Sequence, residues 1–511
     1  MEGNRAQALE GEPAAARRPP WMGYVRRQPE KTVLHKAVRE NLETFLAQVR
    51  AADPEGRGLP GYVEQEFRSY LDCGSLEKGY AVLECDRCGK KEPVAFSCKT
   101  KTFCPSCLTR RMHAVAADLI DRVLPVAPYR HWVLSFPIEL RFLLARDEAL
   151  LAKLREIFLR SVRAWQRAKA RALGLRGAQT GAVAFTQRFS SRLLLYPHIH
   201  CVVPDGVFAE DEAGKLVFHE LKPRDEDIEK VAARIARRTA KTLARLDVEA
   251  LQPEPLDQVR GMAQQGELAI KLAEVEKVGQ ATGRMLARVA GFSLQAARHL
   301  RENDRSGLEF LIRYVLRPPL ALERMKELPS GNIELGLKRP LGSGTTAIEL
   351  TPMALMRRLA SLVPPSGNHD TCYFGVLAPN VAWSSRLVRG PRKEPDCLHS
   401  GCEEREAQVA TLPDQIDPLF GEEEERQAYI PWAELMKRVH KIDVLKCPCG
   451  GRRRFVGYVT EPEKIREGLE KLGLWSEAPP LAKARRPPQE DLFDRRPDAD
   501  GVDPPSPDWA A

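Results

Sequence analysis

Residues 196–203 read Tyr-Pro-His-Ile-His-Cys-Val-Val, and this stretch decides the fold expected for the middle of the chain. Apart from its two histidines the run is apolar and β-branched, which predicts a buried strand. Side chains alternate across a strand, so His198 and His200 face one side while Ile199 and Cys201 face the other. Two imidazoles on one face can share a divalent ion, although isolated pairs of this kind are more often structural. The apolar surroundings favour an ion, because buried histidines without partners are costly.

The segments around this strand predict a mixed α+β fold. Residues 181–189 and 131–136 also have the composition of buried strands, and a hairpin is expected from 333–340 to 345–350. Apolar residues recur at helical spacing in four further segments, 31–50, 147–173, 227–246 and about 268–300.

A short helix is expected downstream, from Gly307 to Leu316 or Arg317. Ser306-x-x-Glu309 is a capping box that would begin it, and two prolines at 318 and 319 would end it. At about 100° per residue, its inward face consists of Leu308, Leu311, Ile312 and Val315. Its opposite face consists of Phe310, Arg313, Tyr314 and Arg317.

This outer face has the chemistry for in-line attack on a phosphodiester. The Tyr314 phenol would be the nucleophile, while Arg313 and Arg317 would neutralise the developing charge and help to lower the effective pKa of the phenol. A metal ion on the two histidines would polarise a non-bridging oxygen. Taken alone, the helix fits an ordinary half-buried tyrosine with solvated arginines at least as well.

The cysteines predict a structural zinc ion in the N-terminal part of the chain. Cys85-x2-Cys88 is followed, after fifteen residues, by Cys104-x2-Cys107, which is the spacing of a four-cysteine zinc ribbon. Four protein ligands leave no open position for water, so this zinc would stabilise the fold and take no part in catalysis.

Two further cysteines, Cys73 and Cys98, lie near this cluster, as does His113. We expect these cysteines to be buried thiols, with a second ion as the alternative, because neither belongs to a close pair. Basic residues of the module could reach phosphates, and they are Lys99, Lys101, Arg110 and Arg111.

Length and charge permit a nucleic-acid partner without establishing one. The 511 residues suffice for two to four domains, and 79 Lys+Arg against 70 Asp+Glu give a net charge of +9. No stretch approaches the roughly 18 apolar residues of a membrane helix, and the N-terminus lacks a signal pattern. We therefore expect a cytoplasmic, nucleoid-associated protein, whose 12 cysteines bind metal more readily than they form disulfides.

Taken together, these segments resemble the insertion-sequence 91 family of rolling-circle transposases, whose nuclease core belongs to the HUH (His-hydrophobic-His) superfamily. The resemblance covers about residues 31–474 and rests on six stretches in one order: SCKTKTFCPSCLTRRM, HWVLSFP, TQRFSSRLLLYPHIHCVVPDGVF, LIRYVLRPPLALERM, YFGVLAPN and VHKIDVLKCPCGG. It implies an α+β fold with an HUH-type core, in which helices accompany an antiparallel sheet. A zinc-ribbon module would precede the core and a small C-terminal unit would follow it.

The resemblance implies a 5′-phosphotyrosine bond between Tyr314 and a cut single strand, so that single-stranded DNA and transposon ends would be partners. His198 and His200 would hold Mg²⁺ or Mn²⁺. A third ligand is usual in the family, and Gln187 is the first candidate, with Asp205 second.

One position departs from the family pattern. Founding members are similar to two-tyrosine enzymes with Tyr-x3-Tyr, but here the first position is Phe310, which has no nucleophile. The chain therefore resembles the one-tyrosine branch, in which a second subunit or a second round at Tyr314 supplies the other cleavage. Arg317 would fill the role of the lysine in the Tyr-x-x-Lys of related replication initiators.

The expected domain order is a disordered arm (1–30), a zinc-binding domain (31–115), a catalytic domain (116–380), a linker (381–425), a small C-terminal unit (426–475) and a disordered tail (476–511). The C-terminal unit contains Cys447-Pro-Cys449, whose single intervening residue differs from CxxC. We expect no zinc there, since it would need partners from among Cys397, His399 and Cys402.

The tail contains a second resemblance. Gln489-Glu-Asp-Leu-Phe493 is similar to the signature by which bacterial proteins bind the sliding clamp. Leu492 and Phe493 would fill an apolar pocket, and Gln489 would bond to its rim. A solvated linker with an incidental Leu-Phe pair is the simpler alternative.

Two other functions compete with the strand transferase. One is a zinc-dependent DNA-binding protein without catalysis, either regulatory or decayed, and the other is a metal-dependent phosphohydrolase that activates water and leaves Tyr314 idle. The presence of His198, His200 and Tyr314 together favours the transferase.

Overall fold

The computed structural model describes residues 27–245, 254–264, 285–338, 340, 344–389, 430–474 and 479–485. The chain forms two compact units. The smaller combines Leu76–Phe96 with Pro395–Ser476, and the larger contains Gln28–Ser75, Ser97–Glu394 and the end of the chain. This division differs from the expected one, because a segment of the predicted zinc domain groups with the predicted C-terminal unit. No helix in the described ranges is long and apolar enough to cross a membrane.

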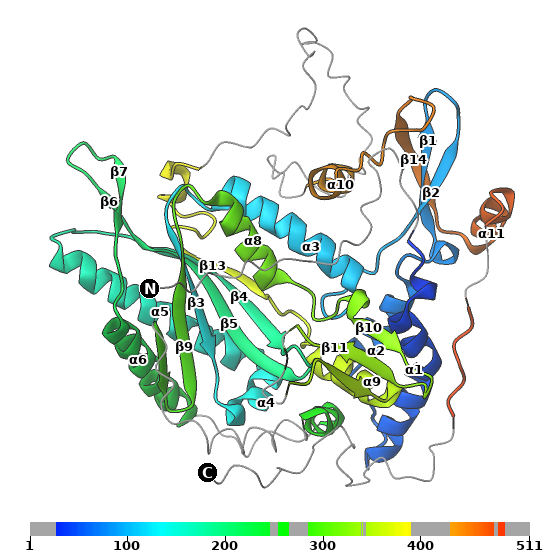
Figure 1. The fold of residues 1–511 in the computed structure, drawn as a ribbon, viewed down its shortest axis with the longest axis horizontal. Coiled ribbons are helices and arrows are strands. Elements are labelled where there is room, and N and C mark those ends of the chain that lie inside the picture. The colour runs from blue at the N-terminus through cyan, green and yellow to red at the C-terminus, as the bar shows by residue number, and fades with distance from the viewer. Residues whose placement is uncertain are drawn as a thin grey trace, which may run out of the picture. The chain divides into compact units, whose positions relative to one another are not determined.

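The centre of the larger unit is a six-stranded antiparallel sheet (Figure 1). Its strands are, in spatial order, β13 (Thr371–Gly375), β4 (Gly181–Phe189), β5 (Leu195–Pro204), β3 (Tyr129–Ser135), β9 (Phe292–Leu300) and β8 (Leu286–Val289). The three strands predicted from residues 131–203 are confirmed and lie side by side as β4, β5 and β3. A separate hairpin pairs β6 (Gly206–Glu210) with β7 (Leu216–Glu220).

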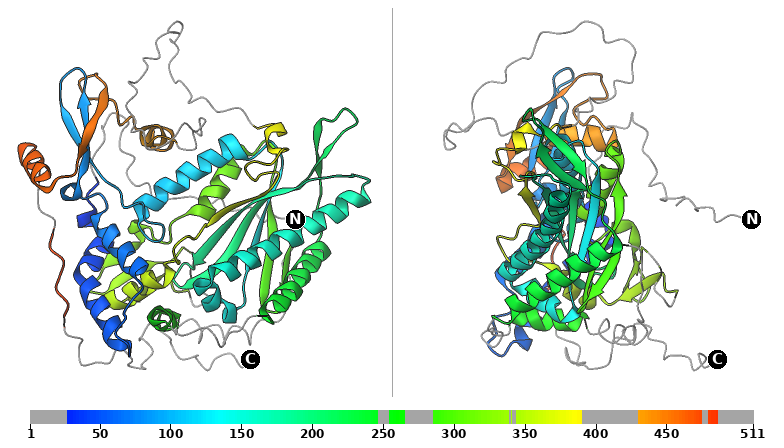
Figure 2. Two further views of the ribbon diagram at one scale, coloured as in Figure 1. Left: turned by 180° about the vertical axis from the view of Figure 1, so that it is seen from behind. Right: turned by 90° about the vertical axis from the view of Figure 1, so that its left-hand side faces the viewer.

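Helices cover both faces of this sheet (Figure 2). On one face α4 (Ile138–Arg146), α5 (Glu148–Ala172) and α6 (Asp225–Leu243) bury Trp132, Leu134 and Ile199. On the other, α3 (Pro105–Asp118) and α8 (Arg305–Leu316) bury Phe185 and Val202. Each fully buried leucine or phenylalanine of these cores contributes about 1.5–3 kcal/mol to stability. The sheet is thus fixed between two helical layers, and its two faces carry different chemistry.

A second core lies beside the sheet within the larger unit. Its helices are α1 (Val33–Ala52), α2 (Gly61–Asp72) and α9 (Pro352–Leu362), and they pack with β10 (Met325–Glu327), β11 (Ile333–Gly336) and β12 (Ala347–Leu350). The Thr32 hydroxyl accepts the His35 N–H and so begins α1. The predicted hairpin is confirmed, since β11 and β12 pair antiparallel.

Short helical turns connect these elements. They are η1 (Pro29–Lys31), η2 (Leu76–Lys78), the π-turn η3 (Leu119–Val123), η4 (Leu322–Arg324) and η5 (Ser384–Arg386).

The smaller unit is a three-stranded sheet with two helices. The strand order is β14 (Arg453–Val459), β1 (Tyr80–Cys85) and β2 (Lys91–Ala95), and the helices are α10 (Trp432–His440) and α11 (Pro462–Lys471). Its small core contains Leu76, Tyr80, Ile465 and Leu469. The predicted C-terminal unit therefore supplies an edge strand to the hairpin of the predicted zinc domain.

One predicted helix is wrong from Leu286 onward. The structure has the β8–β9 hairpin there, turning at Ala290 and Gly291, which both have positive φ. Phe292, Leu294 and Ala296 alternate toward the core shared with α6. Pairing with β3 and this alternation outweigh the helical spacing that the same residues also satisfy.

The start of the predicted tail contacts α1. The Ala482 N–H donates to the Arg39 carbonyl at 3.3 Å, and the Arg485 N–H donates to the Thr44 hydroxyl at 3.0 Å. Most of the predicted arm, most of the predicted linker and the clamp-like residues Gln489, Leu492 and Phe493 lie outside the described residues.

Candidate functional site

The two histidines of β5 lie on the sheet face that α8 covers. His198 is opposite Gln187 of β4, and His200 is opposite Phe185. Directly opposite residues share a face. Phe185 packs in the same core as the apolar side of α8, including Ile312. The helix with the candidate nucleophile and the paired imidazoles therefore occupy the same side of the sheet.

Hydrogen bonding fixes the ring of His198. Its Nδ1 lies 2.7 Å from the Tyr196 carbonyl oxygen. A carbonyl only accepts, so Nδ1 carries the proton and the Nε2 lone pair is left for an ion. The rings of His198 and His200 have centroids 4.7 Å apart, close enough for one ion to reach both.

A third histidine, His131 of β3, belongs to this site and was not assigned from the sequence. Its Nε2 lies 3.0 Å from Nδ1 of His200, and the two rings stack with centroids 5.1 Å apart. If His200 donates from Nδ1, its Nε2 is also free for an ion. The sequence offers one signal for this residue. His131 is the first residue of the predicted strand His-Trp-Val-Leu-Ser-Phe, and alternate side chains of a strand share one face.

All three imidazoles are neutral near pH 7. Burial lowers the pKa of His131 and of His198 to about 4, with further lowering from Arg298 near His131 and Arg317 near His198. Burial also lowers the pKa of His200 well below its usual value, helped by the adjacent imidazoles. The neutral imidazole is the form that binds metal.

Gln187 connects the histidines to the helix above them. Its Oε1 lies 3.4 Å from Nε2 of His200, and its Nε2 donates to the main-chain carbonyl of Val315 in α8. Gln187 is buried. The first candidate for a third ligand thus lies beside the imidazoles, with its oxygen toward them.

Asp205, the second candidate for the third ligand, does not lie beside His198 and His200. Both of its carboxylate oxygens accept from the buried Arg130 guanidinium, at 2.9 and 2.6 Å. It follows the end of β5, five residues beyond His200, which is about 16 Å along a strand. Its role is to neutralise Arg130 in the interior, and His299 is a further neighbour at 3.4 Å.

The start of α8 differs from the expected capping box. The Asp304 carboxylate accepts the Gly307 N–H at 2.8 Å, so the helix begins at Arg305 and Ser306 lies within its first turn. Arg305 donates to the carbonyls of Leu124 and Pro125, each at 3.1 Å. These bonds tie the start of α8 to the segment that follows α3.

The two aromatic side chains on the outer face of α8 are exposed. Tyr314 is 44% exposed and Phe310 is 55% exposed, although both are large. The Arg317 guanidinium lies over the Tyr314 ring, 4.3 Å from its centroid. The same cation lowers the pKa of His198 and of His200. Arg317 is therefore within electrostatic range of both the phenol and the imidazoles.

Two further cations lie on or near this side of α8. Arg313 is half-buried, and its Nε has no hydrogen-bond partner in the described part of the chain. Lys338, which was not assigned from the sequence, has its pKa lowered to about 8 by burial and by Arg317 and Arg324. Cations in this arrangement are suited to an anionic ligand such as phosphate.

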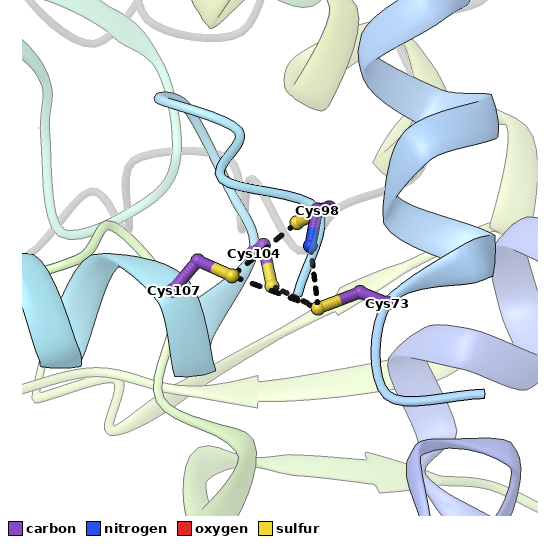
Figure 3. Close-up of side chains that lie close together, drawn as sticks. All are labelled: Cys73, Cys98, Cys104 and Cys107. Carbon is purple, nitrogen blue, oxygen red and sulfur yellow. Dashed lines mark hydrogen bonds between the residues drawn. The ribbon is translucent and has the colours of Figure 1, made fainter. Parts of the chain in front are cut away.

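The predicted set of four zinc ligands is wrong. Cys104 and Cys107, at the start of α3, lie with Cys73 and Cys98 (Figure 3), and all four sulfurs are within 4.8 Å of one another. The closest pairs are 3.4–3.6 Å apart. Four sulfurs around a zinc ion at about 2.3 Å are separated by about 3.8 Å, so this cluster fits a structural zinc.

Cys85 and Cys88 instead lie with Cys447 and Cys449, again with all sulfurs within 4.8 Å. The spacing shows that each CxxC pair is a turn suited to metal, but it does not show which pairs combine. The expected burial of Cys73 and Cys98 as spare thiols is corrected by the same observation, since both complete the first cluster.

Comparison with known families agrees with these positions. A family model described as "Transposase zinc-binding domain" matches residues 38–136, which contain the cluster of Figure 3. A second, described as "Putative transposase", matches residues 181–384, which contain His198, His200, Gln187, Tyr314 and Arg317.

A curated relative supports the same assignment. The "Putative transposase y4qJ" of Sinorhizobium fredii is 31% identical over 141 residues, which are 27% of this chain and 34% of the relative. The chain thus matches about a third of the relative's length, and no solved structure matches. Two transposase domain models matched in one chain, in the order expected from the sequence, support an insertion-sequence 91-like transposase.

Proposed function

We propose that this transposase cuts and rejoins single-stranded DNA through a 5′-phosphotyrosine bond at Tyr314, as in rolling-circle transposition. The observation that carries the proposal is the position of α8. The main-chain carbonyl of Val315 in this helix accepts a hydrogen bond from Gln187 Nε2. The Oε1 atom of Gln187 lies 3.4 Å from Nε2 of His200. The residue next to the nucleophile is thus tied to the metal-binding face.

The chemical step is a transesterification. The Tyr314 phenol oxygen attacks phosphorus, the bond from phosphorus to the 3′ oxygen breaks, and the phenol proton is lost while the 3′ oxygen gains one. The product is a 5′-phosphotyrosine and a free 3′-OH. Attack of this hydroxyl on the phosphotyrosine phosphorus breaks the bond to the phenol oxygen, returns the proton to Tyr314 and rejoins the strand. No net bond energy is consumed, so the reaction is reversible and needs no nucleotide cofactor.

The surrounding residues favour the transition state. Arg317, which lies over the Tyr314 ring, would stabilise the extra negative charge on the phosphate in the transition state, and Arg313 adds a second cation. Mg²⁺ or Mn²⁺ held by Nε2 of His198 and of His200 and by Oε1 of Gln187 would polarise the scissile phosphate. The neutral imidazoles and the amide oxygen fit such an ion.

A single tyrosine limits the reaction of one subunit. Phe310 occupies the position one helical turn before Tyr314 and is also exposed, but it offers no nucleophile. Each subunit would make one covalent bond at a time. The second cleavage of a transposition cycle would need a second copy of the chain, or resolution and reuse of Tyr314.

The test uses single-stranded oligonucleotides tiling both flanks of the chain's own coding sequence, incubated with full-length protein and Mn²⁺. We expect a protein–DNA band on a denaturing gel that is absent with Tyr314→Phe. Tyr458→Phe is the matched control, since Tyr458 is 70% exposed and lies in the smaller unit, and it should form the band normally.

The outcomes separate the competing functions. Binding without cleavage by the wild type would indicate a DNA-binding protein. Cleavage without a covalent band, unchanged in Tyr314→Phe, would indicate a phosphohydrolase that uses water. Either outcome contradicts the proposal.

A further inference from the structure

The second cysteine cluster has the dimensions of a metal site. The sulfur of Cys85 lies 3.5 Å from that of Cys449, and the sulfur of Cys88 lies 3.7 Å from that of Cys447. All four are within 4.8 Å of one another. These separations match the roughly 3.8 Å edge of a tetrahedral zinc–thiolate site. Two of the four cysteines, Cys447 and Cys449, lie outside both regions that the family models match. The sequence predicted no zinc at this pair.

Both cysteine pairs are held in similar turns. The Gly89 N–H donates to the Cys85 carbonyl, and the Gly450 N–H donates to the Cys447 carbonyl, each at 3.0 Å. Gly89 and Gly450 both have positive φ, at 68° and 86°, which glycine adopts without strain. The single residue between Cys447 and Cys449 therefore does not prevent the second turn from presenting its sulfurs.

The two turns are also bonded to each other. The Asp86 N–H donates to the Arg452 carbonyl at 2.9 Å, and the Arg452 N–H donates to the Asp86 carboxylate at 2.8 Å. Arg87 donates to the Cys449 carbonyl at 2.9 Å. A Cβ at Gly451 would lie 2.6 Å from the Arg87 side chain, so the turns meet where only glycine fits.

The apolar core of the smaller unit is slight. Among its described residues, one cluster buries Leu76, Tyr80, Ile465 and Leu469, and Leu83, Leu435 and Val444 are buried outside that cluster. Domains with so few buried side chains generally need a metal or disulfides to remain folded. The pairing of β14 with β1 joins segments more than 360 residues apart, and closing such a loop costs conformational entropy.

We propose that Cys85, Cys88, Cys447 and Cys449 bind a second structural zinc ion, which holds the C-terminal strand β14 on the β1–β2 hairpin. The ion has four protein ligands and no position for water, so its role is to fold the smaller unit. The proposal does not depend on the chemistry at Tyr314.

The first test is the zinc content of full-length protein, measured by native mass spectrometry with elemental analysis. We expect two zinc ions per chain in the wild type and one in Cys88→Ser. Cys88→His keeps a zinc-binding atom and should restore the second ion. Cys372→Ser is the control, since Cys372 belongs to neither cluster, and it should retain two. A wild type with one zinc that Cys88→Ser retains would overturn the proposal.

The second test asks what the ion holds, and it uses hydrogen exchange. In Cys88→Ser the amides of β14 should exchange at least tenfold faster than in the wild type, whereas those of β5 in the larger unit should not change. Unchanged exchange in β14 after loss of the second zinc would refute the structural role.

Discussion

His200 has a neighbour at each of its ring nitrogens, and its tautomer decides which nitrogen can bind an ion. Nδ1 contacts His131 at 3.0 Å, while Nε2 faces Oε1 of Gln187 at 3.4 Å. A donor at Nδ1 leaves a lone pair at Nε2 pointing to the side where Gln187 also presents an oxygen. The site therefore depends on two residues outside the His-Ile-His motif, on the strands to either side of β5.

Replacing Gln187 should separate its two roles. Gln187→Leu removes the oxygen beside His200 and the donor to Val315, so we expect covalent adduct formation to fall at least tenfold while single-stranded DNA binding persists. Gln187→Glu keeps an oxygen for the ion and should retain more activity at high Mn²⁺. Equal adduct yields for Gln187→Leu and the wild type would contradict the assignment.

The buried histidines predict a dependence of stability on pH. The pKa of His131 is about 4 in the folded protein and near 6.5 when unfolded, so between these values the unfolded state binds more protons. The free energy of unfolding should fall as the pH drops from 6.5 toward 4, with about 2 kcal/mol from this residue between pH 7 and 5. Urea denaturation of His131→Gln should show a smaller decrease than the wild type. Equal decreases would mean that His131 is not buried and neutral.

At the scale of single elements, α8 presents the proposed nucleophile because of its sequence pattern and its caps. Leu308, Leu311 and Ile312 bury one side, which leaves Tyr314 on the other. This much follows from the spacing of apolar residues alone. The capping residue did not follow, because both Ser306 and Asp304 suit an N-cap and only the path of the preceding chain distinguishes them.

The cap can be tested with a matched pair of substitutions. Asp304→Ala should lower the free energy of unfolding by about 1 kcal/mol, since the Gly307 N–H loses its acceptor. Ser306→Ala should change it by less than about 0.5 kcal/mol, because Ser306 is an exposed residue within the first turn. A larger effect for Ser306→Ala would favour the capping box predicted from the sequence.

The strands around the site were predictable because each is a short run of apolar, aromatic or β-branched residues, and β4 was predicted with its observed ends. Residues 286–300 were not, because Leu, Ala and Phe at mixed spacing satisfy a helix and a strand equally. There the decision lies with the partner strand β3, which local sequence does not reveal. His131 was missed for the same reason, since its contact with His200 depends on the β3–β5 register.

At the scale of the whole molecule, the cysteines show what sequence spacing leaves open. Spacing indicates that Cys85-x2-Cys88 and Cys104-x2-Cys107 are metal-binding turns. It does not indicate that the first pairs with Cys447 and Cys449 and the second with Cys73 and Cys98. Such pairings join distant segments, so they depend on which strands and helices pack together. The proposed catalytic residues could be singled out from the sequence because each lies within one strand or one helix of recognisable pattern.

The most direct measurement of the central claim is the chemical identity of the covalent bond. The adduct formed with single-stranded DNA is digested with nuclease and protease and sequenced by mass spectrometry. We predict one modified peptide, with a nucleotide joined through its 5′ phosphate to Tyr314, and a free 3′-OH on the released strand. A nucleotide on any other residue, a bond through a 3′ phosphate, or cleaved DNA with no modified peptide would contradict the account.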